Sequence, residues 1–327
     1  MRISVVIPTR NRPDSLRRLL QSIQQQTLQV QEVIIIDSSD DVSYHQSIIN
    51  SFPDLLPQII KTDVCSVCVQ RNMGIQKATS EWIFLCDDDL EVPADYLNKI
   101  SQHIQSHPEA GAITGNVMQN NGKGNTWTEQ YPITSSFDLL ARFVFQLSIW
   151  GEIEIERPNF LVRSLEKYYK KKGNHLSKAG WPVITDFSGS YFRTPFYGLG
   201  ASVVKKEWLI NSPYDEVLDP HGIGDNFDVA SAFPAEGIHV VKDAFVYHYR
   251  ASENRLSLPE IYYRRMLALD YFLKTKKQLQ HVSKSWFLWS LIGSMTFLLF
   301  PKNIQMIKVN LKLLATILSG NNAYLLG

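Results

Sequence analysis

Three consecutive aspartates, Asp87, Asp88 and Asp89, directly follow an apolar run at residues 82–86. Such a run is typical of a buried strand, so the three carboxylates would leave the edge of a sheet together. At least two of them can reach one hard cation bound to a diphosphate, because Mg²⁺ and Mn²⁺ are held by one or two carboxylates plus phosphate oxygens. The segment lacks the glycine and the later ligands of an EF-hand. The alternative interpretation is a solvated acidic loop.

Two further polar residues follow apolar runs in the same way. Thr9 comes at the end of the run at residues 3–8, and Asp37 comes after residues 33–36. Between the two runs, apolar residues recur at helical spacing behind Pro13, as in the first turn of a helix. This pattern predicts a β-α-β unit. In such sheets ligands bind at the carboxyl ends of the strands.

The alternation continues along the chain. Strand-like segments at 59–61, 82–86 and 112–117 alternate with helical segments at 67–78 and 93–104. We therefore expect an α/β fold with a mainly parallel sheet flanked by helices. The periodicity weakens from residue 122 to 182, and after residue 259 the chain is predicted to be helical.

The composition narrows the class of function. The chain has 327 residues, of which 44% are hydrophobic and 20% charged, so it can bury a large core. A formal net charge of +1 provides no field to gather nucleic acid, which we do not expect as a partner. Three cysteines cannot form a disulfide framework, and the first residues lack the charged and apolar regions of a signal segment. We expect the catalytic part in the cytoplasm.

Four ordered segments resemble the family 2 glycosyltransferases with the GT-A fold. Residues 4–12 (SVVIPTRNR) and 33–39 (VIIIDSS) are similar to the first strand and turn and to the second strand of that family. Residues 71–75 (RNMGI) resemble its RN-x-G helix start, and residues 84–93 (FLCDDDLEVP) resemble its DxD segment. The resemblance covers residues 2–250 and implies a GT-A-like, Rossmann-type fold with a helical C-terminal appendage.

The expected organisation has three parts. Residues 1–120 form the nucleotide-sugar-binding half of the main domain, and residues 121–255 form its acceptor-binding and catalytic half. Residues 256–327 form a helical region that can associate with a membrane.

The resemblance also implies the donor site. The nucleotide-diphospho-sugar would contact Pro8, Thr9, Arg12, Asp37, Arg71, Asp87 and Asp88, with Asp37 near the base or ribose. Mg²⁺ or Mn²⁺ would be held by Asp87 and Asp89. Each residue has a structural alternative: Thr9 can cap a helix, Asp37 can close a turn, and Arg71 can pair with a surface carboxylate.

The second half of the chain supplies a candidate base. Residues 198–206 (GLGASVVKK) look like the small-residue strand beneath the acceptor, which implies contacts at Gly200 and Ala201. Residues 222–228 (GIGDNFD) resemble a segment that usually reads Glu-Asp, with Gly224 in place of the glutamate and placed beside the acceptor. We predict Asp225 as the general base, with Asp228 as its rival.

The predicted reaction is a direct displacement at the anomeric carbon. The acceptor oxygen loses its proton as the new bond forms, and a carboxylate on the face opposite the nucleotide can take that proton. A metal stabilises the negative charge of the leaving diphosphate. In the resembling family, a histidine at the position of His248 often reaches the metal or diphosphate, which makes it our third candidate metal ligand. The alternative for His248 is a structural role.

The C-terminal region carries a different signal. The apolar run at residues 286–300 is shorter than the roughly 20 residues needed to span a bilayer. Its tryptophans and the lysines around it suit a helix lying at the membrane interface, at the inner face of the cell membrane, which fits a lipid-linked sugar acceptor. The alternative is a helix packed on the core or on a second copy, so homo-oligomerisation stays open.

Two weaker sequence signals can also be interpreted without any function. Cys65 and Cys68 have the spacing of a redox or zinc pair, but the chain has no second such pair. The basic run at residues 167–172 suits a phosphorylated acceptor or anionic lipid, and equally a solvated surface.

The motifs and the resemblance thus predict a metal-assisted glycosyltransferase of polysaccharide or glycolipid synthesis, and the resemblance alone implies that the transfer is inverting. A sugar-phosphate nucleotidyltransferase would begin with a glycine-rich loop, which residues 8–13 lack. A non-catalytic, membrane-peripheral assembly or nucleotide-binding protein with a degenerate transferase fold is the other alternative. Gly224 favours it, whereas the retained aspartates at 87–89 and 225 oppose it.

Overall fold

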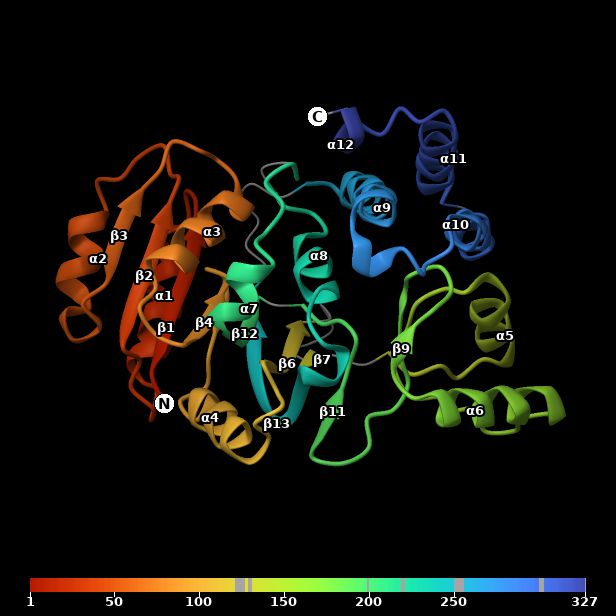
Figure 1. Cartoon of the computed structure of the whole chain (residues 1–327), viewed down its shortest axis with the longest axis horizontal. Helices are drawn as coiled ribbons and strands as arrows, with labels where there is room; N and C mark the ends of the chain where they lie inside the picture. Colours follow the sequence, from red (N-terminus) through yellow and green to blue (C-terminus); the bar gives the residue numbers. More distant parts are fainter. Residues whose placement is uncertain are drawn as a thin grey trace. The chain divides into compact units, whose positions relative to one another are not determined.

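The computed structural model of the chain describes residues 1–120, 127–128, 131–198, 200–218, 221–249, 256–299 and 303–326. Residues 122–125, Leu199, Arg250 and Phe300 lie outside the described part. The chain divides into two compact units (Figure 1). The first unit contains Met1–Glu129 and Ser190–Arg255, and the second contains Gln130–Gly189 and Leu256–Gly327.

The first unit is built on one mixed sheet with the order β11-β13-β6-β12-β4-β1-β2-β3. Strands β4, β1, β2 and β3 run parallel to one another, whereas β12 is antiparallel to both β4 and β6. Two short strands pair at the side, β5 with β13 and β7 with β6. The strands are β1 (Ile3–Thr9), β2 (Glu32–Asp37), β3 (Gln58–Lys61), β4 (Trp82–Cys86), β5 (Leu90–Glu91), β6 (Ala112–Asn120), β7 (Trp127–Thr128), β11 (Tyr191–Arg193), β12 (Ala201–Lys205) and β13 (Ile238–His248).

Helices follow most of the parallel strands, as the alternating sequence predicts. In chain order they are α1 (Pro13–Gln24), α2 (His45–Ser51), α3 (Val67–Lys77), α4 (Tyr96–Ser106), α7 (Lys206–Asn211) and α8 (Asp225–Ser231), with short 3₁₀ turns η1 (Pro53–Leu55) and η2 (Ala235–Gly237). Pro13 occupies the first turn of α1, where its missing N–H costs no hydrogen bond.

Both faces of the sheet are covered, and the central strands β1 and β4 are therefore buried along their whole length. One face of β1 packs with the apolar stripe of α1 and with α4, in a core that includes Val5, Ile7, Leu16, Leu20 and Ile100. Helix α3 lies against β1 and β2, and a Cβ at its Gly74 would overlap Val6. Glycine at this position therefore lets α3 approach the sheet closely.

The second unit is mainly helical and has its own core. Its helices are α5 (Ser136–Phe145), α6 (Phe160–Lys172), α9 (Leu258–Thr275), α10 (Lys284–Leu299), α11 (Ile304–Leu318) and α12 (Ala323–Leu326), with a 3₁₀ turn η3 (Lys277–Leu279). A small sheet joins β8 (Ile149–Trp150), β10 (Pro182–Ile184) and β9 (His175–Leu176). Among the described residues, no helix is long and apolar enough to cross a membrane.

The predicted α/β class, the mainly parallel sheet and the helical C-terminal region are confirmed. The division into units differs from the expected three segments, because residues 130–189 group with residues 256–327 and not with the sheet. The reason is packing: α5 lies against α10 and also contacts α6 within the second unit. The functional roles of the three segments stay predictions.

Candidate active site

The predicted site residues meet at the carboxyl edge of the parallel strands in the first unit. Thr9, the last residue of β1, lies directly opposite Asp37, the last residue of β2. Strand β4 lies on the other side of β1 and delivers residues 87–89 to the same edge. Antiparallel β12 then brings Gly200 alongside, and its carbonyl accepts a hydrogen bond of 2.9 Å from the amide of Asp87.

Asp88 points inward and fixes the turn after β1. Its side chain accepts hydrogen bonds from the Thr9 hydroxyl at 2.7 Å and from Arg12 Nη1 at 3.0 Å. Burial raises the pKa of Asp88 to about 6, although the Arg12 charge and the Thr9 hydroxyl oppose this. Asp88 therefore shapes the edge through Thr9 and Arg12, and both of its oxygens are engaged inside the protein.

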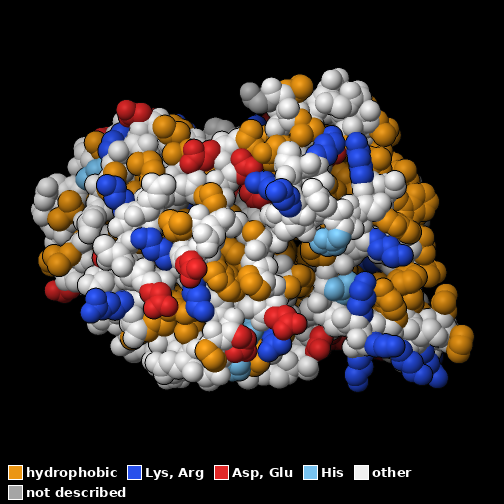
Figure 2. Space-filling view, viewed as in Figure 1, with side chains coloured by type: hydrophobic (Ala, Val, Ile, Leu, Met, Phe, Trp, Pro, Cys, Tyr) orange, Lys and Arg blue, Asp and Glu red, His pale blue; other side chains and the backbone are white. Residues whose placement is uncertain are grey.

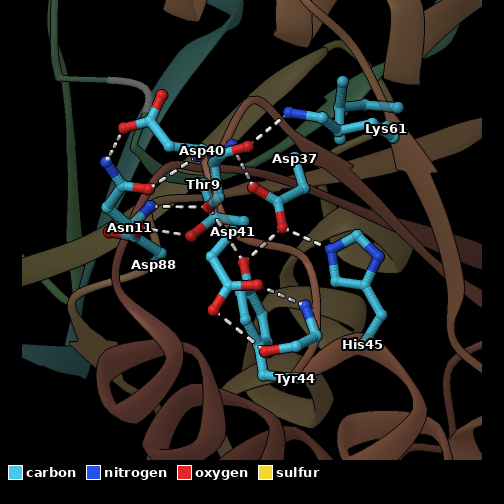
Figure 3. A network of polar contacts seen from close by, with 12 residues as sticks. Thr9, Asn11, Asp37, Asp40, Asp41, Tyr44, His45, Lys61 and Asp88 are labelled. Carbon is cyan, nitrogen blue, oxygen red and sulfur yellow. Dashed lines mark hydrogen bonds and ion pairs between the residues drawn. The ribbon is translucent and has the colours of Figure 1, made fainter.

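Asp37 is fully buried and organises the loop after β2 (Figure 3). It accepts hydrogen bonds from the Ser39 amide at 2.7 Å and from the Tyr44 hydroxyl, and His45 Nε2 lies 2.5 Å from its Oδ2. Burial together with Asp37 raises the pKa of Tyr44, so this hydroxyl remains a donor. In this arrangement a nucleotide can reach the Asp37 carboxylate only if Tyr44 or His45 turns away.

The loops after β1 and β2 are tied to each other by Asn11, which has a left-handed φ of 55°. Its amide side chain pairs with Asp40, donating to the carboxylate at 2.8 Å and accepting from the backbone N–H at 2.9 Å (Figure 3). Lys61, at the end of β3, donates to the Ser39 carbonyl. These contacts hold the edge in one conformation.

Gln70 on α3 satisfies the ends of both strands. Its side-chain amide donates at 2.8 Å to the Thr9 carbonyl and at 2.8 Å to the Ile36 carbonyl, all within the protein interior. Buried carbonyls without donors are costly, so this side chain stabilises the strand ends that present Thr9 and Asp37.

Arg71, the next residue on α3, links two carboxylates across the site. Its guanidinium donates to Asp87 Oδ1 at 2.6 Å and to Asp225 Oδ2, and only 5% of the residue is exposed. Burial acts to lower the pKa of Arg71, but the two carboxylates outweigh burial and hold that pKa above its usual range. Arg71 thus joins the end of β4 to the start of α8.

Tyr214 and Asn72 position this guanidinium. The Tyr214 ring lies over Arg71, with 5.1 Å from the guanidinium carbon to the ring centroid. Asn72 fixes the backbone of Tyr214 through two hydrogen bonds, one to the carbonyl at 2.9 Å and one from the amide at 3.0 Å. The Tyr214 hydroxyl is buried and has no hydrogen-bond partner among the described residues.

Asp225 begins helix α8 and is almost fully buried. Burial raises its pKa to about 6, and Arg71 and the Asn226 amide oppose that rise. Gly224 precedes it with a φ of 103°, in the region that favours glycine, so a glutamate at this position would be strained. The departure from the Glu-Asp pattern therefore agrees with the local backbone.

His248 and Asp89 form a second polar pair at the edge. His248 Nε2 lies 3.1 Å from Asp89 Oδ1, and its Nδ1 lies within hydrogen-bond distance of the Gln119 amide group. Gln119 and His248 are opposite each other in the parallel β6–β13 register, which orients the imidazole toward Asp89. Arg12 Nη1 lies 3.9 Å from the other oxygen of Asp89.

The carboxylate of Asp89 and the imidazole of His248 are ligand types that a divalent cation accepts. A carboxylate oxygen and an imidazole nitrogen point at one another, and Gln119 fixes the imidazole as an outer partner of a metal-binding histidine does. In the described part of the chain, no three His, Cys, Asp or Glu side chains form a complete metal cluster. Asp87, the third predicted ligand, is paired with Arg71 in this structure.

The remaining predicted residues take different positions. A Cβ at Gly200 would overlap the Asp87 carboxylate, so the glycine leaves room for the Asp87 side chain to reach Arg71. Ala201 is fully buried in the core, and its carbonyl accepts hydrogen bonds from Tyr96 and Thr114. Its side chain is thus part of the core and does not face the site. Pro8 is buried in β1, opposite Ile36.

Five side chains that shape the site were not among the predicted residues. They are Tyr44, His45, Gln70, Gln119 and Tyr214. Gln70 lies one residue before the RN-x-G segment, which is the only local signal that any of the five carries.

Comparison with known proteins agrees with this architecture. The sequence profile described as Glycosyl transferase family 2 matches residues 4–200. A glycosyltransferase of Bacillus subtilis (strain 168), YwdF, is 35% identical over 108 residues, which cover 32% of this chain and 39% of that protein. The amylovoran biosynthesis glycosyltransferase AmsE of Erwinia amylovora is 22% identical over 143 residues, covering 41% of this chain and 51% of its own length. The matched segments thus span about half or less of these relatives.

Solved structures show the same fold at low sequence identity. S. aureus TarS 1–349 in complex with UDP-GlcNAc has a TM-score of 0.53 at 15% identity, with 94% of this chain and 79% of that chain covered. GalNAc-T7 with UDP, GalNAc and Mn²⁺ has a TM-score of 0.54 at 14% identity, with 90% and 54% covered. The mixed sheet flanked by helices, together with the likeness to these structures, identifies a GT-A-like fold. With its profile match spanning residues 4–200, the chain belongs to the family 2 glycosyltransferases.

Proposed function

We propose that this glycosyltransferase moves a sugar from a nucleotide-diphospho-sugar to an acceptor hydroxyl in one inverting displacement, with Asp225 as the general base. The observation that carries the proposal is the buried carboxylate of Asp225, tied through Arg71 to Asp87 at the end of β4. In the reaction the acceptor oxygen forms a bond to the anomeric carbon and loses its proton to Asp225. The bond from that carbon to the diphosphate breaks, and the nucleoside diphosphate leaves with the electron pair.

The residues around Asp225 suit a base. Its raised pKa, about 6, is close to neutral pH, where a carboxylate remains ionised and yet accepts a proton more readily than an exposed one. Arg71 orients one oxygen of Asp225, and the Asn226 amide donates to the other oxygen at 2.6 Å. Arg71 and Arg12 provide positive charge near the edge where a donor diphosphate would bind.

Asp89 and His248 would hold Mg²⁺ or Mn²⁺, with Asp87 as a further ligand if its pairing with Arg71 opens. When bound, the cation supplies positive charge that stabilises the leaving diphosphate. The GalNAc-T7 structure contains Mn²⁺ together with UDP, so Mn²⁺ is the first ion to test.

We further propose a sugar or lipid-linked sugar as acceptor, in polysaccharide or glycolipid synthesis at the inner face of the cell membrane. The likeness to the amylovoran biosynthesis protein supports the polysaccharide role. The TarS complexes with UDP and UDP-GlcNAc make uridine diphosphate sugars the first donors to assay.

A second candidate function is nucleotide binding without transfer. Gly224, in place of the glutamate of the usual Glu-Asp pattern, is the observation that favours it. The backbone conformation at Gly224 weakens this argument, because it accounts for glycine without any loss of Asp225.

Two matched variants test the proposed base. Asp225→Asn keeps the shape of the side chain but cannot accept the proton, so we expect kcat to fall by about 10²–10⁴-fold. Asp228→Asn removes the rival carboxylate on the same helix, and we expect it to retain transfer. Sugar transfer is measured by release of nucleoside diphosphate, and nucleotide binding by thermal shift. Full transfer activity in Asp225→Asn would contradict the assignment of Asp225 as the base. Loss of transfer in Asp228→Asn, with transfer retained in Asp225→Asn, would assign the base to Asp228 instead.

A further inference from the structure

Helix α11 presents an apolar stripe on its exposed side. Ile304, Leu311 and Leu318 recur at intervals of seven residues and are 64%, 54% and 68% exposed. The opposite side of the helix is buried at Asn310, Leu313 and Ile317. An amphipathic helix normally turns its apolar residues inward, so an outward apolar stripe beside an inward one marks a contact surface.

Helix α10, which is in contact with α11, also exposes apolar side chains. Its Phe287 and Leu291 are buried, whereas Trp289 and Ile292 are 40% and 42% exposed. Helix α10 packs against both α11 and α5 inside the second unit, and Trp289 donates a hydrogen bond of 3.0 Å to the Val144 carbonyl. Figure 2 shows hydrophobic side chains gathered over these helices, with lysines and arginines around them. We define the α10–α11 surface as Trp289, Ile292, Ile304, Lys308, Leu311 and Leu318.

The charge around this surface is mainly positive. Residues 271–327 contain no aspartate or glutamate and seven lysines. The whole second unit, residues 130–189 and 256–327, has 17 Lys and Arg against 8 Asp and Glu, a net charge of +9. The remaining residues have 16 against 24, a net charge of −8. Lys308 lies exposed within the apolar stripe itself, and Lys312 lies over the Tyr263 ring next to it.

We propose that the α10–α11 surface lies on an anionic lipid bilayer, with the apolar stripe inserted at the headgroup boundary and the lysines against the lipid phosphates. Exposed leucine, isoleucine and tryptophan beside lysines, without acidic residues, form the pattern of interfacial helices. Lysines near an anionic bilayer surface are attracted to it, and this attraction adds to the apolar insertion. A second copy of this chain is a poorer occupant, because it would place lysines against lysines.

This membrane contact rests on the proposed function, because a lipid-linked acceptor lies in the bilayer to which the surface would bind. Membrane binding can nevertheless be measured without any sugar transfer. The full chain is sedimented with vesicles of phosphatidylcholine containing about 30% phosphatidylglycerol, and with pure phosphatidylcholine vesicles. We expect binding to the anionic vesicles only, and weaker binding at high salt because the lysine contribution is screened.

The double variant Leu311→Asp/Leu318→Asp places two charges in the stripe at exposed positions, where the fold tolerates them. We expect vesicle binding to fall by about tenfold or more, because both apolar insertion and charge attraction are lost. Leu56→Asp is the matched control, since Leu56 is 77% exposed on the first unit and has a left-handed φ that aspartate accepts. Thermal melting and nucleotide-induced thermal shifts of all variants report on folding and on the donor site separately.

Several results would overturn the inference. The wild-type chain would fail to sediment with anionic vesicles, or the double variant would bind them as well as wild type does. A wild-type dimer that the double variant converts to a monomer, without vesicle binding, would assign the surface to a second copy. Loss of transfer to a water-soluble acceptor in Asp225→Asn, with vesicle binding intact, would separate the two proposals.

Discussion

At the scale of single residues, Arg71 sets the charge state of the candidate active site. It is buried between Asp87 and Asp225, so the two carboxylates share one guanidinium that cannot lose its proton. Neutralising Arg71 would leave the buried Asp225 carboxylate without its positive partner and close to the partly exposed Asp87, which raises the pKa of Asp225 further. The pairing therefore keeps the proposed base ionised at neutral pH despite its burial.

The pH dependence of transfer follows from the raised pKa of Asp225, about 6. Only the unprotonated carboxylate accepts the acceptor proton, so activity is full above the pKa and is lost as the pH falls through it. We expect kcat/KM to decrease by about tenfold per pH unit below that point. The measurement is a pH–rate profile from about pH 4.5 to about pH 8, with nucleotide binding followed over the same range.

Asp88 needs a control, because burial raises its pKa to about 6 as well. Asp88→Asn should retain the acidic limb of the profile if Asp225 is responsible for it. A flat profile for the wild-type enzyme, or a limb that disappears in Asp88→Asn, would argue against Asp225 as the base.

Gly200→Ala tests how closely β12 approaches the aspartates. A Cβ at Gly200 would overlap the Asp87 carboxylate and push it from Arg71, whereas a Cβ at Gly198 would meet no atom of the described residues within 4 Å. We expect Gly200→Ala to raise the KM for the donor by about tenfold, or about 1.4 kcal/mol. Gly198→Ala is the matched control and should behave as wild type. Equal kinetics for the two variants would mean that the position of Asp87 is unimportant for the donor.

At the scale of elements, Gln70 couples α3 to the ends of β1 and β2. Gln70→Ala leaves the Thr9 and Ile36 carbonyls buried without their donor, and we expect the free energy of unfolding to fall by about 2 kcal/mol. Gln76→Ala changes an exposed residue of the same helix and should alter that free energy by less than about 0.5 kcal/mol. Urea unfolding measures both, and similar values would contradict the role of Gln70.

The sequence predicted which residues meet at the carboxyl edge of the sheet, but not the side-chain contacts among them. Thr9, Asp37 and residues 87–89 follow apolar runs, and parallel strands necessarily bring their carboxyl ends to one edge. The contact between Gln119 and His248 depends on the β6–β13 register. The Tyr214 ring lies over Arg71 because Asn72 holds the backbone of Tyr214 by hydrogen bonds. Neither contact leaves a local pattern. The resemblance implied an acceptor contact at Ala201, whereas β12 is a central strand and the Ala201 side chain lies in the core.

At the scale of the whole molecule, opposite charges are segregated between the two units. The net charge of +1 of the whole chain hides the net charge of +9 of the second unit, because the remaining residues have a net charge of −8. Local sequence patterns also do not predict that residues 130–189 group with the C-terminal helices. It depends on packing of α5 against α10, two helices that lie far apart in the sequence.

The most direct test of the account is a thermal-shift measurement with nucleotide diphosphates and their sugar conjugates, with and without Mn²⁺, on wild type and on Asp89→Asn. Selective binding to the folded chain raises its melting temperature. We predict a metal-dependent rise with one class of nucleotide, and the loss of the metal-dependent part in Asp89→Asn, because the carboxylate beside His248 no longer binds the cation. A rise that is unchanged in the variant, or no rise with any nucleotide, would contradict a metal-assisted nucleotide-sugar transferase.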